Sequence, residues 1–228
     1  MRHFRARWLC LLLLLPCCAG FLLFRFIHWP PASPPETDPL TAFVSAGIPG
    51  SEFLLFPNGN LNGWYPVGIG RWTIQDGILS IRHGIGYLAT HCDTLTDFTL
   101  SLHVRTGPQA NSGVFFRATH PSWDLRPWPV GYEAQVDHHD PRNPTGSLYN
   151  RHTASGHPPR DGEWFTMDIT VKGPSVQIKI NQEVVVSATD TTYQTGFLAL
   201  QAHGPQSWVE YKDGRLLLLD RKESEEGH

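Results

Sequence analysis

The sequence has little charge of either sign. Of its 228 residues, 18 are Lys or Arg and 21 are Asp or Glu, so the formal net charge is −3. This balance gives no excess of basic residues for binding nucleic acid, and we expect no nucleic-acid partner. The hydrophobic fraction of 40% is nevertheless sufficient for a packed core, which excludes wholesale disorder.

Cysteine is scarce outside the N-terminal region. Cys10, Cys17 and Cys18 lie in one apolar run, and Cys92 is the only cysteine in the rest of the chain. The main domain therefore cannot close an internal disulfide and must depend on its core. We expect Cys92 to be a small buried residue, with a reactive thiol as the alternative.

Several catalytic signatures are also missing. The sequence contains no GxSxG, HExxH or GxGxxG motif and no P-loop. These absences remove most of the support for a triad hydrolase, a zincin or a nucleotide enzyme. No convincing helical period follows residue 51, while 21 Gly and 19 Pro favour turns over long helices.

The chain opens with an export signal or a membrane anchor. Arginines in the first seven residues precede an apolar run of 17 residues, Trp8–Phe24. Three alternatives stay open: an uncleaved anchor, a cleaved signal peptide and a lipoprotein modified at Cys17 or Cys18. We therefore expect the main domain to be exported, on the periplasmic or extracytoplasmic face of the membrane.

The domain organisation follows from this start. We predict a signal or anchor over residues 1–29, a proline-rich linker over 30–50, a globular domain over 51–220 and a charged tail over 221–228. The proline density of WPPASPPETDP is typical of a stiff, extended spacer. The segment Leu40–Gly50 is weakly patterned, and its secondary structure is left open.

The globular domain is predicted to be an all-β sandwich of two antiparallel sheets. Short alternating segments are separated by Gly, Pro, Asn and Asp. The expected strands are Trp72–Ile74, Ile78–Arg82, Phe98–Arg105, Gly113–Ala118, Tyr132–Asp137, Trp164–Lys172, Val176–Asn181, Glu183–Ser187, Gly196–Ala202, Trp208–Lys212 and Arg215–Asp220. The pairs Asp76-Gly77 and Asp213-Gly214 predict hairpin turns.

The strand GYEAQVD, residues 131–137, carries the most chemistry. Glu133, Gln135 and Asp137 share one of its faces because alternate strand residues point the same way. The two carboxylates have Cα atoms about 13 Å apart, whereas carboxyl groups that act on one glycosidic bond lie about 5–9.5 Å apart. The row is either a solvated surface or a sugar-binding or catalytic face, and two-carboxylate hydrolysis is not established.

Two further strands offer charged or titratable groups. Arg117 ends the apolar segment NSGVFFR and needs a partner there, which Glu133 or Asp137 could supply. It forms either an internal ion pair or a site for an anionic, enolate-like oxygen. Gln201 and His203 share a face of LALQAHG, where His203 is either structural or an acid–base group.

Aromatic residues and an acidic turn complete the candidates. Tyr149 belongs either to the core or to a site, and Trp123 and Trp128 belong to a loop that either stacks on a sugar ring or forms a packed lid. Residues 137–140, Asp-His-His-Asp, suggest a metal site, but consecutive strand residues point to opposite faces. We therefore predict no metal at this tetrad and leave open calcium bound by scattered oxygens.

Taken together, these segments resemble the 3-keto-disaccharide hydrolase family, formerly a domain of unknown function. The resemblance covers about Leu54 to Leu219. The matching segments are LNGW (61–64), DGILSI (76–81), TDFTLSLHVRT (96–106), NSGVFFR (111–117), GYEAQVD (131–137), TGSLY (145–149), GEWF (162–165) and GFLALQAHG (196–204). The resemblance implies an exported, sugar-active domain with a concanavalin A-like jelly-roll fold.

The resemblance also implies a chemistry. A keto group at C3 of a glycoside acidifies the C2 proton, so one base and an enolate stabiliser suffice to expel the aglycone, and hydration completes the cleavage. We expect Glu133 or His203 as the base and Arg117 as the stabiliser. The expected sugar-binding residues are Gln135, Asp137, Tyr149, Gln201, Trp123 and Trp128. No cofactor is required, and a separate oxidoreductase would supply the 3-keto sugar.

Two other classes of function remain open. A non-catalytic carbohydrate-binding domain on the same sandwich would bind sugar without turnover. A structural or adhesion domain would leave the polar residues dispersed over the surface, with no shared site.

Overall fold

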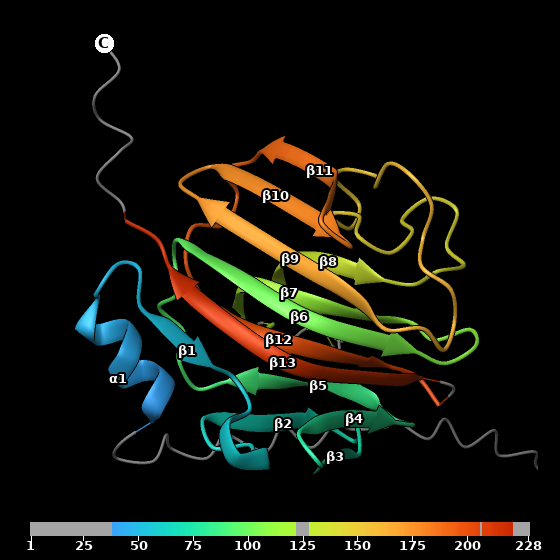
Figure 1. Cartoon of the computed structure of the whole chain (residues 1–228), viewed down its shortest axis with the longest axis horizontal. Coiled ribbons are helices and arrows are strands. Elements are labelled where there is room, and N and C mark those ends of the chain that lie inside the picture. The colour runs from blue at the N-terminus through green and yellow to red at the C-terminus, as the bar shows by residue number, and fades with distance from the viewer. Residues whose placement is uncertain (1–37, 122–127, 206, 221–228) are drawn as a thin grey trace, which may run out of the picture.

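Two antiparallel β-sheets packed face to face make up most of the protein (Figure 1). The structure is a computed structural model that describes residues 38–121, 128–205 and 207–220. Among these residues one sheet has eight strands and the other has five. The predicted all-β, two-sheet antiparallel sandwich is therefore confirmed.

The eight-stranded sheet is the nearer layer in Figure 1. Its path is β11-β10-β9-β6-β13-β4-β3, and β1 pairs with β13. The strands are β1 (Glu52–Leu54), β3 (Trp72–Gln75), β4 (Ile78–Arg82), β6 (Phe98–Thr106), β9 (Phe165–Lys172), β10 (Ser175–Ile180), β11 (Glu183–Thr189) and β13 (Trp208–Leu218). Alternate residues of β6 and β9 are buried, as their sequence pattern predicts, and they face the core between the sheets.

The five-stranded sheet lies behind it and has the order β2-β5-β12-β7-β8. Its strands are β2 (Trp64–Gly68), β5 (Ile85–Thr90), β7 (Ser112–Thr119), β8 (Val130–Val136) and β12 (Phe197–His203). Nearly every residue of β5, β7 and β12 is buried, although only one face of each strand can meet the larger sheet. The outer face of this sheet must therefore be covered as well.

The sequence prediction missed three strands and placed one turn wrongly. Strands β1, β2 and β5 were not predicted: β1 is short, Pro66 interrupts the pattern of β2, and β5 is buried on both faces, so it has no alternation to detect. Asp213-Gly214 is no hairpin turn. It is an irregularity inside the continuous strand β13, where the pairing with β6 shifts between Lys212 and Arg215. Asp76-Gly77 does join β3 to β4, with both residues at positive φ, as predicted.

In the part of the chain that the structure describes, one α-helix, α1 (Pro39–Ala46), precedes the sandwich. Asp38 caps its first turn by accepting a hydrogen bond from the Thr41 N–H at 2.8 Å, and Gly47 ends the helix in a left-handed conformation. Leu40 is buried in the main core. The helix lies within residues 30–50, for which we predicted a linker. Part of that segment therefore packs against the sandwich.

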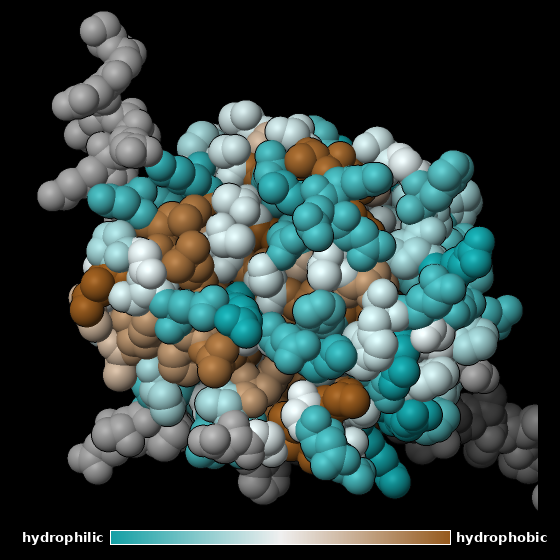
Figure 2. Space-filling model, viewed as in Figure 1, coloured by the Kyte–Doolittle hydropathy of each residue, from teal (hydrophilic) through white to brown (hydrophobic). Residues whose placement is uncertain are grey.

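Other predictions fall outside the described residues: the apolar run Trp8–Phe24 with its N-terminal helix, Trp123 and the charged tail. Among the helices that the structure describes, none is long and apolar enough to span a membrane. Cys92 is buried and free, as predicted. Figure 2 shows polar residues over much of the outer face of the larger sheet, with apolar residues gathered toward the end where α1 and β1 lie.

Candidate functional site

Buried polar side chains gather on the outer face of the five-stranded sheet. In β8, Ala134 points into the core, so Glu133 and Gln135 face outward. The register pairs Gly113 of β7 with Gln135, and on its other side Gly113 lies opposite Gln201 of β12. Three strands thus bring Glu133, Gln135 and Gln201 together around a glycine.

Glu133 is a buried carboxyl group in an apolar setting. The residue is only 8% exposed, and desolvation by burial raises its pKa from 4.5 to about 8. Within the described part of the chain, its side chain has neither a hydrogen-bond partner nor an ion-pair partner. A carboxyl group held in this way has a pKa suited to moving a proton near neutral pH.

Gly113 makes room for this carboxyl group. A Cβ atom at residue 113 would overlap the Glu133 Oε1 and crowd its Cδ and Cγ. The Glu133 side chain therefore leans across β7, and Gly113 fixes where the carboxyl group lies.

The two glutamines beside it are also buried residues, and the Gln201 Oε1 is a buried atom without a partner among the described residues. Gln135 is 2% and Gln201 is 3% exposed. The Gln201 Oε1 has no hydrogen-bond partner, and the described residues offer none to the Gln135 side chain. Unpaired buried polar groups are rare because each costs about 1–3 kcal/mol. A ligand rich in hydroxyl groups would satisfy them.

His203 and Trp128 stand at the margin of this group. Their rings are stacked, with centroids 4.9 Å apart and an interplanar angle of 14°. Burial lowers the pKa of His203, and the Asp137 carboxylate partly offsets the effect. Trp128 thus lies beside the predicted histidine, although it stacks on protein.

Asp137 and Tyr149 lie at the edge formed by β8. The Asp137 Oδ1 accepts hydrogen bonds from the backbone N–H groups of His139 at 2.8 Å and Asp140 at 3.1 Å, so this carboxylate stabilises a turn. The Tyr149 N–H donates to the Glu133 carbonyl at 2.9 Å, and the residue is 39% exposed. Tyr149 is therefore next to Glu133 and is not a core residue.

The structure places Arg117 elsewhere. Its φ is 47°, and the pairing of β7 with β8 shifts between Phe116 and Thr119, so a bulge ends the alternation there. The guanidinium group is buried, and it donates to Asp97 Oδ1 at 2.9 Å and to the Thr96 carbonyl at 2.9 Å. The expected partners Glu133 and Asp137 were wrong, and Arg117 is an internal ion pair that does not face the enolate site we predicted.

Three residues that the sequence did not single out lie on the same outer face. The Tyr65 hydroxyl is 2.6 Å from Nε2 of His120, and the Tyr87 hydroxyl is 2.8 Å from Nδ1 of the same ring. His120 also contacts Phe197 at 4.7 Å between ring centroids. The tyrosines belong to β2 and β5, the two strands of this sheet that the sequence pattern did not reveal, so the cluster could not be found from alternation.

The turn after β8 holds no cluster suited to a metal. His139 pairs with Asp161 at 3.0 Å, and His138 Nδ1 is 2.7 Å from the Thr145 hydroxyl. Across residues 38–121, 128–205 and 207–220, no group of three or more His, Cys, Asp or Glu side chains is arranged to hold a metal ion.

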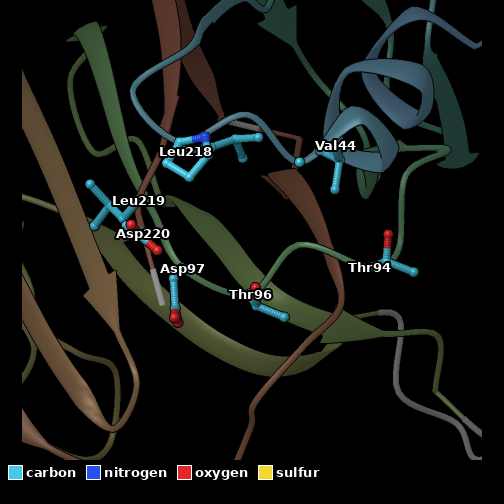
Figure 3. A pocket seen from close by; sticks show the side chains of 9 residues that line it. Val44, Thr94, Thr96, Asp97, Leu218, Leu219 and Asp220 are labelled. Atoms are coloured by element: carbon cyan, nitrogen blue, oxygen red, sulfur yellow. The ribbon is translucent and has the colours of Figure 1, made fainter. Parts of the chain in front are cut away.

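A cavity of about 400 Å³ lies at another place, between α1 and the end of β13 (Figure 3). Asp97, Thr96 and Asp220 line it together with apolar residues. It contains none of the residues predicted for the site, and the Asp97 carboxylate in its wall is held by Arg117. The candidate site is therefore the outer face of the five-stranded sheet.

This fold is that of the lectin and glucanase class of β-sandwich domains. Residues 53–217 match the family described as the 3-keto-alpha-glucoside-1,2-lyase-like domain, and the chain belongs to that family. The resemblance found in the sequence is thus confirmed. No protein of curated function matches the sequence.

Solved structures with this fold come from different kinds of protein. A protein from Parabacteroides distasonis ATCC 8503, described as a candidate glycosyl hydrolase, is 18% identical with a TM-score of 0.64, over 75% of this chain and 95% of its own. A second structure with the same description and organism is 18% identical with a TM-score of 0.60, over 74% and 100% of the two chains. The VIP36 exoplasmic/lumenal domain, solved with Ca²⁺ and Man₃GlcNAc, is 12% identical with a TM-score of 0.54, over 75% and 90%.

Proposed function

We propose that the protein cleaves glycosides that carry a keto group at C3, with Glu133 as the base. One observation carries the proposal: a single buried carboxyl group with a raised pKa lies beside two glutamine side chains that make no hydrogen bond to the described residues. Membership of a family described as 3-keto-alpha-glucoside-1,2-lyase-like supports the same chemistry.

The reaction has an elimination step and a hydration step. The Glu133 carboxylate takes the C2 proton, and the electron pair forms an enolate that includes the C3 oxygen. Re-formation of the C3 carbonyl then drives a double bond between C1 and C2, while the C1–oxygen bond breaks and the aglycone leaves with a proton. Water next adds its oxygen to C1, and Glu133 returns a proton to C2, so the net result is hydrolysis.

The geometry favours this route over hydrolysis by two carboxylates. Asp137 is the other acidic residue predicted for the site, and its Oδ1 is engaged by two backbone N–H groups of the following turn. Glu133 would then work alone, which suffices once the keto group has acidified C2. Gln135 and Gln201 would bind sugar hydroxyls, and Tyr149, Trp128 and His203 would flank the ring.

His203 remains the alternative base. Its lowered pKa makes it neutral at physiological pH, which is the form that accepts a proton. Its ring, however, stacks on Trp128 and lies at the margin of the site. His203→Gln should therefore reduce turnover far less than Glu133→Gln, and the opposite order of effects would transfer the role of base to His203.

The experiment compares two substrates. Full-length protein is incubated with p-nitrophenyl 3-keto-α-glucoside and with the unoxidised glucoside, and nitrophenolate release is followed with and without a chelator, which tests the calcium left open. We expect release from the keto substrate alone. Glu133→Gln should lower kcat by about 10²-fold or more, whereas Glu183→Gln, on an exposed strand of the other sheet, should not.

A non-catalytic carbohydrate-binding domain is the second candidate. The stacked pair of Trp128 and His203 and the shared fold with a lectin domain favour it. It predicts that a folded protein binds sugar, loses affinity in Trp128→Ala and releases nitrophenolate from neither substrate.

We further propose that the domain works outside the cytoplasm and receives its 3-keto sugar from a separate oxidoreductase. The basic head followed by an apolar run supports export, and the sequence itself carries no dinucleotide-binding motif for the oxidation. Fractionation of cells with an antibody against the domain tests the location: recovery in the cytosolic fraction would contradict it.

A further inference from the structure

His120 lies between two tyrosine hydroxyl groups, and this arrangement constrains their protons. A neutral imidazole has one N–H donor and one acceptor nitrogen. One tyrosine must therefore donate to the ring, while the other accepts from it and keeps its own O–H proton for another partner. If the imidazole is protonated, both nitrogens donate and both tyrosine protons are released. Every state leaves at least one hydroxyl proton directed away from His120.

That proton has no acceptor in the described part of the protein. Neither Tyr65 nor Tyr87 makes a hydrogen bond there apart from the one to His120. Burial raises the pKa of Tyr65 to about 12 and raises that of Tyr87 as well, so both hydroxyl groups stay protonated at neutral pH. Tyr87 is paired in register with Gln201, whose Oε1 is itself buried and unpaired. A donor and an acceptor on neighbouring strands thus both lack protein partners.

Tyr65 and Tyr87 lie on the same outer face as Glu133, toward the opposite edge of the five-stranded sheet. Tyr87 is on β5 and Glu133 is on β8, three strand spacings away, or about 14 Å between backbones. The side chains in the row between Tyr65 and Glu133 are Ala89, Ala199 and Phe115. These side chains are buried with Tyr65 and Tyr87 in one apolar cluster, against which Trp128 packs. A glycoside bound over this cluster would present its C2 side to Glu133 and its aglycone side to the tyrosines.

We propose that Tyr65, His120 and Tyr87 form a proton relay that protonates the aglycone oxygen as it leaves. The inference rests on the proposed function and adds to it the acid that the elimination needs. As the C1–oxygen bond breaks, its electron pair stays on the aglycone oxygen, which takes the proton of one tyrosine. That tyrosine takes a proton from the imidazolium of His120, which becomes neutral. During hydration the attacking water returns a proton through the same tyrosine to His120, so the cycle is balanced.

The test varies the leaving group. Nitrophenolate leaves without protonation, whereas methoxide and a sugar alkoxide need a proton. Full-length wild type, Tyr65→Phe, Tyr87→Phe and His120→Gln are assayed on the p-nitrophenyl, methyl and glucosyl 3-keto-α-glucosides. We expect His120→Gln and at least one tyrosine variant to lose about 10²-fold or more in kcat on the methyl and glucosyl substrates and to keep most of their activity on the nitrophenyl substrate. Tyr193→Phe removes a hydroxyl outside the site and should be unaffected.

Each outcome decides the matter. Activity on the nitrophenyl substrate shows that a variant is folded, and circular dichroism checks the fold of any variant that has lost activity on all three substrates. Equal losses on all three substrates would mean that the cluster only maintains the site, and a loss on the glucosyl substrate alone would mean that it only binds a second ring. Either result overturns the relay and leaves the role of Glu133 intact. If the wild type cleaves none of the 3-keto substrates, the proposed function fails and the relay fails with it.

Discussion

At the scale of single residues, the site depends on one carboxyl group and the glycine beneath it. Glu133 is buried and has no side-chain partner among the described residues, and Gly113 provides the space that its carboxyl group occupies. Desolvation is thus concentrated at the residue that would do the chemistry. The rest of the fold must supply the stability that this desolvation removes, which is typical of functional sites.

Gly113→Ala should displace the base while the fold survives. The new methyl group would overlap Glu133 Oε1, so the carboxyl group must move by more than the tolerance of proton transfer. We expect kcat on a 3-keto-glycoside to fall by about 10²-fold. Gly204→Ala is the matched control because nothing lies within 4 Å of an added Cβ there. Full activity in Gly113→Ala would show that the position of Glu133 is unimportant.

The raised pKa of Glu133 predicts opposite trends for activity and stability. Activity needs the carboxylate, so kcat/KM should rise with pH and level off above about 8. The folded protein binds this proton more tightly than the unfolded chain does, so the contribution of Glu133 to stability is full below about 4.5 and is lost as pH rises toward about 8. Glu133→Gln should therefore melt higher than wild type at pH 8 and little differently at pH 4, as thermal unfolding can measure. A constant difference between the two proteins across this pH range would contradict the burial of an ionisable group.

At the scale of strands and loops, Arg117 shows how one irregular residue changes a face. A bulge in β7 turns this side chain away from the row of Glu133. Its guanidinium group then joins β7 to Thr96, Asp97, Gly173 and Tyr193. Its role is to hold loops together, which alternation in the sequence could not distinguish from a role in the site.

Arg117→Ala should destabilise the fold without removing the chemistry. It would leave the Asp97 carboxylate buried and unpaired, at a cost of about 3–5 kcal/mol in the free energy of unfolding. Arg117→Ala combined with Asp97→Asn should recover part of that loss. Denaturant unfolding measures both variants, and kcat per folded molecule should remain close to wild type. A stable Arg117→Ala protein without activity would contradict this account and would support Arg117 as the stabiliser of the enolate.

Strand patterns explain what the sequence could and could not predict. Strands with one wet face, such as β6 and β9, were found because polar and apolar residues alternate. The polar face of β8 was found for the same reason. Strand β5 is buried on both faces and Pro66 interrupts β2, so no alternation predicted these strands or the tyrosines that they carry. The burial of Glu133 depends on packing between distant segments, which no local pattern reports.

At the scale of the whole molecule, the two sheets differ in the polar groups on their outer faces. The larger sheet exposes a polar face on which Glu210 is held by Arg105, Arg82 and the Trp208 N–H, a network that uses its charges internally. The smaller sheet carries Glu133, Gln135 and Gln201 on its outer face, and their side chains make no hydrogen bond to the described residues. The main core and α1 hold the two sheets in place, so the site depends on the complete sandwich.

The helix α1 should contribute measurably to this framework. Leu40 is 2% exposed in the main core, and Leu40→Ala should lower the free energy of unfolding by about 2–5 kcal/mol. Ile48 is 60% exposed, so Ile48→Ala serves as the control and should change stability little. Equal, small effects in chemical denaturation would mean that the helix is not part of the folded unit.

The central claim is that cleavage begins with removal of the C2 proton by Glu133. The most direct measurement uses a 3-keto-glycoside labelled with deuterium at C2, in competition with the unlabelled substrate, and follows both aglycone release and the label in the product. We predict slower release from the labelled substrate and loss of deuterium to solvent, both dependent on Glu133. Equal rates with deuterium fully retained at C2 would contradict elimination and would show that the glycosidic bond is broken directly.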